Sequence, residues 1–278
     1  MFNLLKGECY KLIKSKAFYI SCLVAVISVI FVYGMLITAS KIQSGEMENG
    51  AAGVVVSEEE MQESSTPVLE KITSLDVLQQ MYANFTVFII AVFISIFVIG
   101  EYSNGVIKNV VGKGYARWKI FLSKYFFSIV TAVFFMILMT VVTVIVGCFV
   151  GEGQVAGGTF FMDLLRYAGI QLIICIAFCG VIVTVSELCR TLGAGIAINF
   201  AIATFSTVVA MGLDYLVQLI LPRSDFKVSA YWCVSLMSDC PIKDMDVKFI
   251  LHVLIVSAAW IVITAGAGIF HFNKADIK

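Results

Sequence analysis

Six long apolar runs constrain what this chain of 278 residues can fold into. A helix needs about 20 consecutive apolar residues to cross about 30 Å of hydrocarbon. Each of the six runs reaches that length with little or no charge. The runs are Ala17–Ala39, Met81–Gly100, Tyr125–Val150, Leu164–Ser186, Leu192–Leu221 and Phe249–Phe270. The sequence therefore predicts an all-α polytopic membrane protein with six transmembrane helices, forming a single transmembrane domain over residues 1–278.

The composition supports a membrane protein and excludes other classes. Hydrophobic residues make up 60% of the chain and charged residues 14%, whereas a soluble domain has about 25% charged residues. The 19 basic residues are balanced by 19 acidic residues, so the chain lacks the basic excess of a nucleic-acid binder. The first apolar run is longer than the core of a signal peptide and is expected to remain as a span. We expect the lipid bilayer, and no nucleic acid, as a partner.

The basic residues predict the orientation. Most of them lie in the N-terminal arm (residues 1–16), in the loop 101–124 and in the C-terminal tail, whereas the loop 40–80 is rich in glutamate. Cytoplasmic loops carry an excess of lysine and arginine. Both termini and the loop 101–124 are therefore predicted to be cytoplasmic, with the loops 40–80 and 222–248 on the outside.

The N-terminal arm has an apolar stripe at helical spacing. The stripe consists of Phe2, Leu5, Cys9, Leu12 and Ile13. This pattern favours an amphipathic helix that lies in the membrane interface before the first span. Its basic residues Lys6, Lys11, Lys14 and Lys16 are predicted to anchor it at that interface. A simple positive-inside anchor is the alternative, but it does not explain the stripe.

The loop 101–124 is too long to be only a connector. Ser103 or Asn104 can cap a short helix, whose apolar positions are Val106, Ile107, Val110 and Val111. Gly112 and Gly114 are expected to end it, and a new helix is expected to begin near Tyr115 and to continue into the third span. A helix of this size between two spans is suited to dock into a groove on a soluble partner.

The outer loop 222–248 contains a cluster of aromatic residues around Trp232. Either a partly re-entrant interfacial helix or an ordinary loop fits this cluster. Cys233 and Cys240 lie in this outside loop and could form a disulfide, although spacing alone cannot establish the geometry. Asp214, near the outer end of the fifth span, is read as a solvated helix-end residue, with an intramembrane polar contact as the alternative.

Motifs for catalysis and metal binding are missing from the sequence. There is no His-Glu-x-x-His, no Cys-x-x-Cys and no cluster of carboxylates within a span. Gly105 and Gly112-Lys113 resemble a phosphate-binding loop, but six residues separate the glycines instead of four, and Gly114 replaces the Ser or Thr that holds magnesium. We therefore predict no catalytic residue, metal or cofactor in this chain, and expect ATP and magnesium only in a partner subunit.

The loop between the second and third spans carries a resemblance to a known family. Its residues are Glu101, Gly105, Lys108, Asn109, Gly114, Arg117, Ser123 and Lys124. In this pattern and in its topology the chain resembles the membrane-spanning permease subunit of a type-2 ABC exporter. The resemblance is to small bacterial permeases linked to antimicrobial-peptide export or to lantibiotic and bacitracin immunity. Lys113, Tyr115 and Ala116 depart from the small hydroxyl or proline residues common there.

The resemblance implies a function for this loop. In the family it forms a coupling helix that docks into a separate cytoplasmic ABC ATPase subunit, and two permeases pair. It implies that this chain moves an amphipathic substrate, such as an antimicrobial peptide, out through the bacterial plasma membrane as a homodimer. The residues expected to dock the ATPase are Glu101, Tyr102, Gly105, Lys108, Asn109 and Arg117. A membrane scaffold or sensor that transports nothing is the alternative function.

Overall fold

The computed structural model describes residues 2–43, 74–103, 105–150, 160–189, 191–220, 226–242 and 245–274. All regular elements within these ranges are helical. They are α1 (Phe2–Lys14), α2 (Lys16–Gln43), α3 (Ser74–Gln80), the π-helix η2 (Met81–Thr86), α4 (Val87–Ser103), α5 (Val106–Gly112), α6 (Arg117–Val150), α7 (Phe160–Cys189), α8 (Leu192–Ile220), the 3₁₀-helix η3 (Ser229–Tyr231), α9 (Cys233–Asp239) and α10 (Val247–Lys274). The glutamate-rich part of the predicted outer loop falls outside the described residues.

Six helical segments of the described chain are long and apolar enough to cross a membrane, which confirms the predicted fold class. They are α2, the continuous stretch α3–η2–α4, α6, α7, α8 and α10. All of these segments except α8 extend beyond the predicted runs, and α6 begins at Arg117 rather than at Tyr125. Hydropathy marks only the part of a helix that fits the hydrocarbon, whereas backbone hydrogen bonding continues into the polar interface.

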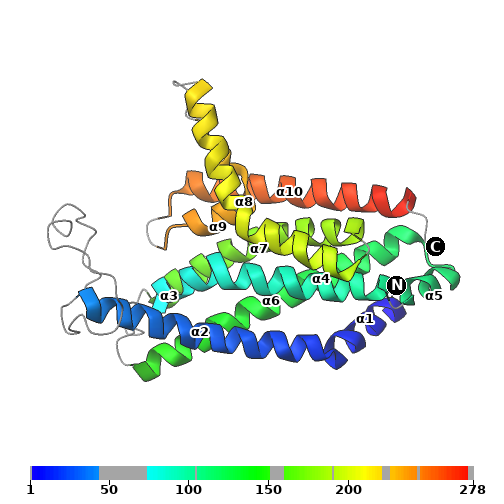
Figure 1. The fold of residues 1–278 in the computed structure, drawn as a ribbon, viewed down its shortest axis with the longest axis horizontal. Helices are drawn as coiled ribbons and strands as arrows, with labels where there is room; N and C mark the ends of the chain where they lie inside the picture. The colour runs from blue at the N-terminus through cyan, green and yellow to red at the C-terminus, as the bar shows by residue number, and fades with distance from the viewer. Residues whose placement is uncertain are drawn as a thin grey trace.

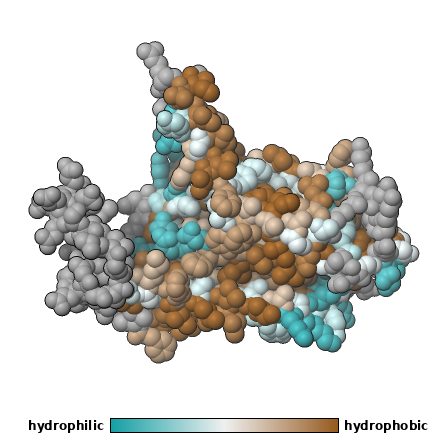
Figure 2. Space-filling view, viewed as in Figure 1, coloured by the Kyte–Doolittle hydropathy of each residue, from teal (hydrophilic) through white to brown (hydrophobic). Residues whose placement is uncertain are grey.

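Helix α7 forms the centre of the bundle. It packs against α4, α6 and α10, and large aromatic side chains such as Phe93, Phe135, Tyr167 and Phe178 are buried around it. The outer surface is also apolar over wide areas (Figure 2), as expected for helices solvated by lipid. The end of α8 stands away from the other helices (Figure 1) and exposes Phe205, Leu216 and Ile220.

The two ends of the bundle differ. The N-terminal helix α1, the end of α10 and the short helix α5 lie at one end, and α3 and α9 lie toward the other (Figure 1). The chain therefore begins and ends its described part at the end that carries α5. This arrangement follows from an even number of spans and agrees with the predicted placement of both termini on one side.

The predicted outer loop contains a short buried helix, α9, rather than only an ordinary loop. The indole Nε1 of Trp232 donates a hydrogen bond to Ser206 Oγ at 2.9 Å, and Gln171 Nε2 on α7 donates to the carbonyl of Met237 at 2.8 Å. Val234, Leu236 and Met237 are almost completely buried. Helix α9 thus covers α7 and belongs to the core.

Asp214, six residues before the end of α8, makes polar contacts with the segment that follows this helix. Its carboxylate accepts hydrogen bonds from the backbone N–H groups of Val228 and Ser229, the latter at 3.1 Å. These donors lie at the beginning of η3, where helical N–H groups lack a partner within the helix. Asp214 therefore ties the outer part of α8 to the loop that follows it.

The possible disulfide between Cys233 and Cys240 is not formed: both residues are free thiols. They lie at the two ends of the seven-residue helix α9, which rises about 10 Å. A disulfide requires a Cα separation below about 7 Å. Burial raises the pKa of each thiol to about 12, so neither forms the reactive thiolate readily.

Candidate functional site

The loop between α4 and α6 is built from a short helix between two glycine turns. Gly105 precedes α5 with a φ of +68°, and Gly114 follows it with a φ of +79°. Both angles lie in the left-handed region, which glycine adopts without the penalty of a Cβ atom. Gly105 is the N-cap of α5, so the sharp left-handed turn begins the helix. The side chains of Ser103 and Asn104, the residues predicted to cap it, lie outside the described residues.

Helix α5 has one buried face and one exposed face. Ile107 is buried, and Val110 and Val111 are half-buried against the hydrophobic core. Asn109, Gly112 and Lys113 are exposed. The apolar residues predicted for this helix thus hold it on the bundle and leave a polar face for a partner.

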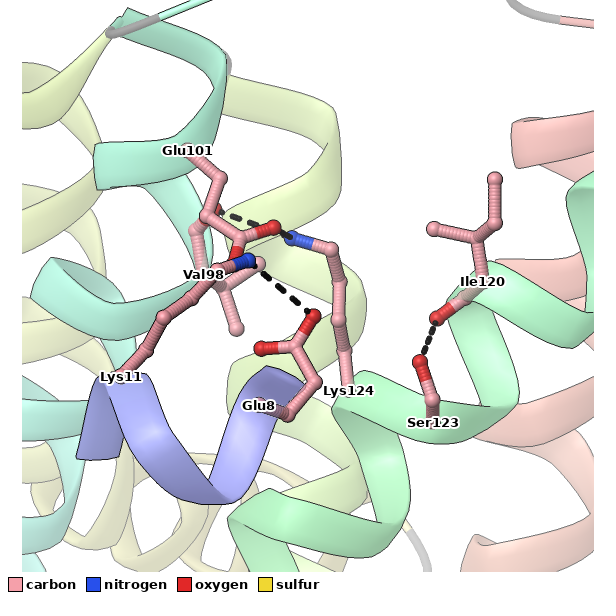
Figure 3. A network of polar contacts seen from close by, with 7 residues as sticks. All are labelled: Glu8, Lys11, Val98, Glu101, Ile120, Ser123 and Lys124. Carbon is pink, nitrogen blue, oxygen red and sulfur yellow. Dashed lines mark hydrogen bonds and ion pairs between the residues drawn. The ribbon is translucent and has the colours of Figure 1, made fainter. Parts of the chain in front are cut away.

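Glu101, in the last turn of α4, is the centre of a buried ion network (Figure 3). Its Oε1 lies 2.7 Å from Lys11 Nζ on α1, and its Oε2 lies 2.7 Å from Lys124 Nζ on α6. Glu101 is 7% exposed and Lys124 is fully buried. Each oxygen of the carboxylate therefore holds a lysine from a different helix.

Lys124 has further partners inside the protein. Its ammonium donates to the carbonyl of Val98 at 3.5 Å and lies 5.4 Å from the centre of the Tyr102 ring. A buried ammonium needs such compensation because its removal from water is costly. Lys124, which lies on α6, thus contacts two successive turns at the end of α4.

Glu8 is a second buried acid beside this network. It is 4% exposed, and its Oε1 lies 3.6 Å from Lys11 Nζ. Burial, together with the nearby negative charge of Glu101, raises the pKa of Glu8 from 4.5 to about 7. Burial acts to lower the pKa of Lys11, but the hydrogen bond and charge of Glu101 outweigh it and raise that pKa. Lys11 therefore stays charged while Glu8 titrates near neutral pH.

The raised pKa of Glu8 predicts a pH dependence of stability. Between pH 4.5 and 7 the unfolded chain loses the proton of Glu8 while the folded protein keeps it, so stability falls as the pH rises through this window. Glu8→Gln removes the ionisable group and should stabilise the protein at pH 8 by the order of 1–3 kcal/mol while changing little at pH 4.5. Thermal unfolding in detergent at both pH values measures this difference.

Asp239→Asn is the matched control, because it neutralises an exposed carboxyl at the opposite end of the bundle. It should leave the pH dependence as in the wild type. An equal response of Glu8→Gln and the wild type to pH would contradict the assignment of a neutral, buried Glu8.

Several residues that were predicted to dock a partner do not lie on an exposed face. Glu101 points into the bundle, and Tyr102 is half-buried beside Lys124. Arg117 Nη1 donates to the carbonyl of Asn273 at 3.2 Å, near the end of α10. A cation at a helix C-terminus also interacts favourably with the helix dipole. Glu101 and Arg117 therefore connect elements of this chain to the loop rather than forming its exposed surface.

The other predicted docking residues are Gly105, Lys108 and Asn109. Asn109 is exposed and Gly105 forms the left-handed turn. Lys108 lies within α5, but its side chain falls outside the described residues.

The four lysines predicted as interface anchors fall into two groups. Lys6, Lys14 and Lys16 are exposed, whereas Lys11 turns inward to Glu101. The reason is the helical spacing: Glu8 and Lys11 share the face of α1 that meets the bundle, while Cys9 and Ile13 of the apolar stripe are exposed on another face.

The sequence did not predict the burial of Glu8 or the central role of Lys124. A signal for Glu8 is its position three residues before Lys11 on one helix face. A signal for Lys124 is its place at the beginning of a long apolar run, where a lysine that faces lipid would be costly.

Together these features define a multi-pass membrane protein whose terminal helix, second and third spans and short connecting helix meet at one end. Residues 4–206 match the model of the family described as ABC-2 family transporter protein, and the chain therefore belongs to this family. The matched part includes the complete ion network and α5. A comparison with curated proteins found no match. The chain is thus a membrane component of ABC-2 type transport, a permease rather than an enzyme.

Proposed function

We propose that this chain is the permease subunit of an ATP-driven exporter and that a separate cytoplasmic ABC ATPase docks on the exposed face of α5. One observation carries the proposal: α5 is fixed between two left-handed glycine turns with its apolar face buried and Asn109 and Lys113 exposed. The short helix is thus presented as a preformed contact, which lowers the entropic cost of binding a partner.

The ion network supports a path for mechanical coupling. A force on α5 acts directly on α4 and α6, which flank it in the chain, and Glu101 links both of them to α1 through Lys11 and Lys124. Nucleotide-driven closure of two ATPase subunits then pushes two such helices together, and the spans rock as connected bodies. Charge-assisted hydrogen bonds at 2.7 Å are short and strong enough to transmit such a movement.

The finer parts of the proposal concern the assembly and the substrate. We infer a homodimer of permeases in the bacterial plasma membrane, and an amphipathic substrate, such as an antimicrobial peptide, that leaves the bilayer or the cytoplasm. Membership in the transporter family supports transport, and the largely apolar outer surface of the bundle supports a path for substrates that partition into lipid. The acidic loop in the sequence favours a cationic peptide.

Co-purification of an ATPase tests the docking surface. The charge reversal Lys113→Glu combined with Asn109→Trp changes the exposed face of α5 without touching its buried residues. We expect the amount of ABC ATPase retained, measured by quantitative mass spectrometry and ATP hydrolysis in the purified complex, to fall at least tenfold. Such a loss corresponds to about 1.4 kcal/mol or more of binding free energy.

Lys248→Glu is the control, because it makes the same charge change at an exposed position at the other end of α10. It should retain the ATPase at the level of the wild type. Full retention by the α5 variant, or the absence of any ATPase from the wild-type preparation, would overturn the proposed docking.

A further inference from the structure

A cavity of about 310 Å³ lies between the elbow that joins α1 to α2, the end of α4 and the beginning of α5. Small-molecule pockets in proteins have volumes of about 300–1,000 Å³, so this cavity has room for part of a ligand. It is lined by Lys11, Ser15, Ala17, Phe93, Ile96, Phe97, Gly100, Glu101 and Val106. The ion network described above forms one side of it.

The chemistry of the lining favours an apolar occupant. Phe93, Ile96 and Phe97 line the cavity from one face of α4. The polar groups of the lining already have partners: Lys11 and Glu101 bind each other at 2.7 Å, and Ser15 Oγ accepts from the N–H of Phe18 at 3.1 Å. Water in an apolar cavity needs two to four polar partners. The remaining apolar wall offers none.

The surroundings of the cavity point to a lipid of negative charge. Immediately after the elbow, α2 exposes the large apolar side chains of Tyr19, Ile20 and Leu23, so the cavity lies at the depth where the hydrocarbon begins. Lys14 and Lys16 flank the elbow and are exposed. Among the described residues, the ion pairs include neither of them. Lys14 Nζ donates a hydrogen bond to the hydroxyl of Tyr10 at 2.7 Å, which leaves two N–H groups of its ammonium for an anion. Exposed lysines near the membrane surface attract anionic lipid headgroups.

We propose that this cavity binds one acyl chain of an anionic glycerophospholipid, whose phosphate lies at Lys14 and Lys16. The lipid fills the space between the elbow and α4 and supports the helix turn that carries Glu101. When the lipid is bound, it thereby fixes the distance between α1 and α4 beside the Lys11–Glu101 ion pair.

Filling the cavity with a side chain tests the proposal. Gly100 lies on the same face of α4 as Phe93, Ile96 and Phe97, and a Cβ atom added to it meets no other heavy atom within 4 Å. The Cβ atom of Gly100→Leu therefore has space, and the rest of its side chain takes up volume in the cavity that Gly100 lines. The control is Gly266→Leu on α10, where an added Cβ also meets nothing within 4 Å and the position is exposed. Both changes raise helix propensity equally.

The measurement is native mass spectrometry of protein released from nanodiscs that contain equal amounts of phosphatidylglycerol and phosphatidylcholine. We expect the wild type and Gly266→Leu to retain one phosphatidylglycerol, and Gly100→Leu to retain at least tenfold less. The double variant Lys14→Gln/Lys16→Gln should lose the preference for phosphatidylglycerol over phosphatidylcholine. Thermal unfolding confirms that each variant is folded.

Two results would overturn the lipid site: equal retention of lipid by Gly100→Leu and Gly266→Leu, or equal retention of the two lipids by the wild type. No ATPase takes part in this measurement. A failure here therefore leaves the docking of an ATPase on α5 untouched, and a failure of docking leaves the lipid site intact.

Discussion

Glu101→Gln is expected to destabilise the protein by about 3–5 kcal/mol and to abolish transport. The substitution removes the negative charge that both Lys11 and Lys124 bind at 2.7 Å. Lys124 is fully buried and is left as an unpaired ammonium, which is the most costly outcome for a buried ion pair. The unfolding temperature in detergent and substrate export from vesicles measure the two effects.

A charge-removal series separates stability from coupling. In the double variant Glu101→Gln/Lys124→Met, the loss of the carboxylate leaves no unpaired buried lysine, so much of the stability should return. Transport should stay absent, because no ion pair connects α4 to α6. Lys11→Met should cost less than Glu101→Gln, since Lys11 is partly exposed, with 38% of its side chain accessible, and Glu101 keeps its bond to Lys124. If Glu101→Gln alone retained normal stability and export, the network would have neither role.

Gly180→Leu is the second substitution with a large expected effect. A Cβ atom at Gly180 on α7 would contact the hydroxyl of Thr264 on α10 and lie 2.7 Å from the hydroxyl of Tyr125 on α6. Three helices therefore meet at this position with no space for a side chain. Extra methyl or methylene groups in a well-packed core cost about 1–3 kcal/mol, and more when the backbone must move. We expect a lower unfolding temperature and reduced yield of folded protein.

Gly169→Leu on the same helix is its matched control. Gly169 is exposed, and an added Cβ there meets no heavy atom within 4 Å. Both substitutions change the helix propensity of α7 by the same amount, so the difference between them reports packing alone. Equal unfolding temperatures for the two variants would show that α6, α7 and α10 are less closely packed than described.

The six spans and the short helix α5 are predictable because their signals are local. The length of an apolar run determines whether a helix can span, and the positions of Gly112 and Gly114 determine where α5 ends. The positions of Val106, Ile107, Val110 and Val111 also predict which face of α5 is buried. Each of these inferences depends on residues that are neighbours in the chain.

The direction of Glu101 is not predictable in this way. An acid at the end of a span can extend to the interface or turn inward, and the choice depends on a partner 90 residues away, Lys11. The same holds for Arg117, which binds a carbonyl 156 residues further along. The buried position of α9 likewise depends on distant contacts with Gln171 and Ser206. Local propensity contains no information on such pairs, because tertiary packing decides them.

The ion network also has a consequence for the order in which the protein is made. Synthesis delivers Lys11 first, then Glu101, and Lys124 last. A lysine inserted without a counter-charge is costly in hydrocarbon, but here the acceptor of Lys124 precedes it in the nascent chain. Glu101 can hold Lys11 before the third span enters the membrane, and Lys124 then completes a site that is already half assembled. The sequence order of three charges thus lets the second and third spans each enter beside a charge partner made earlier.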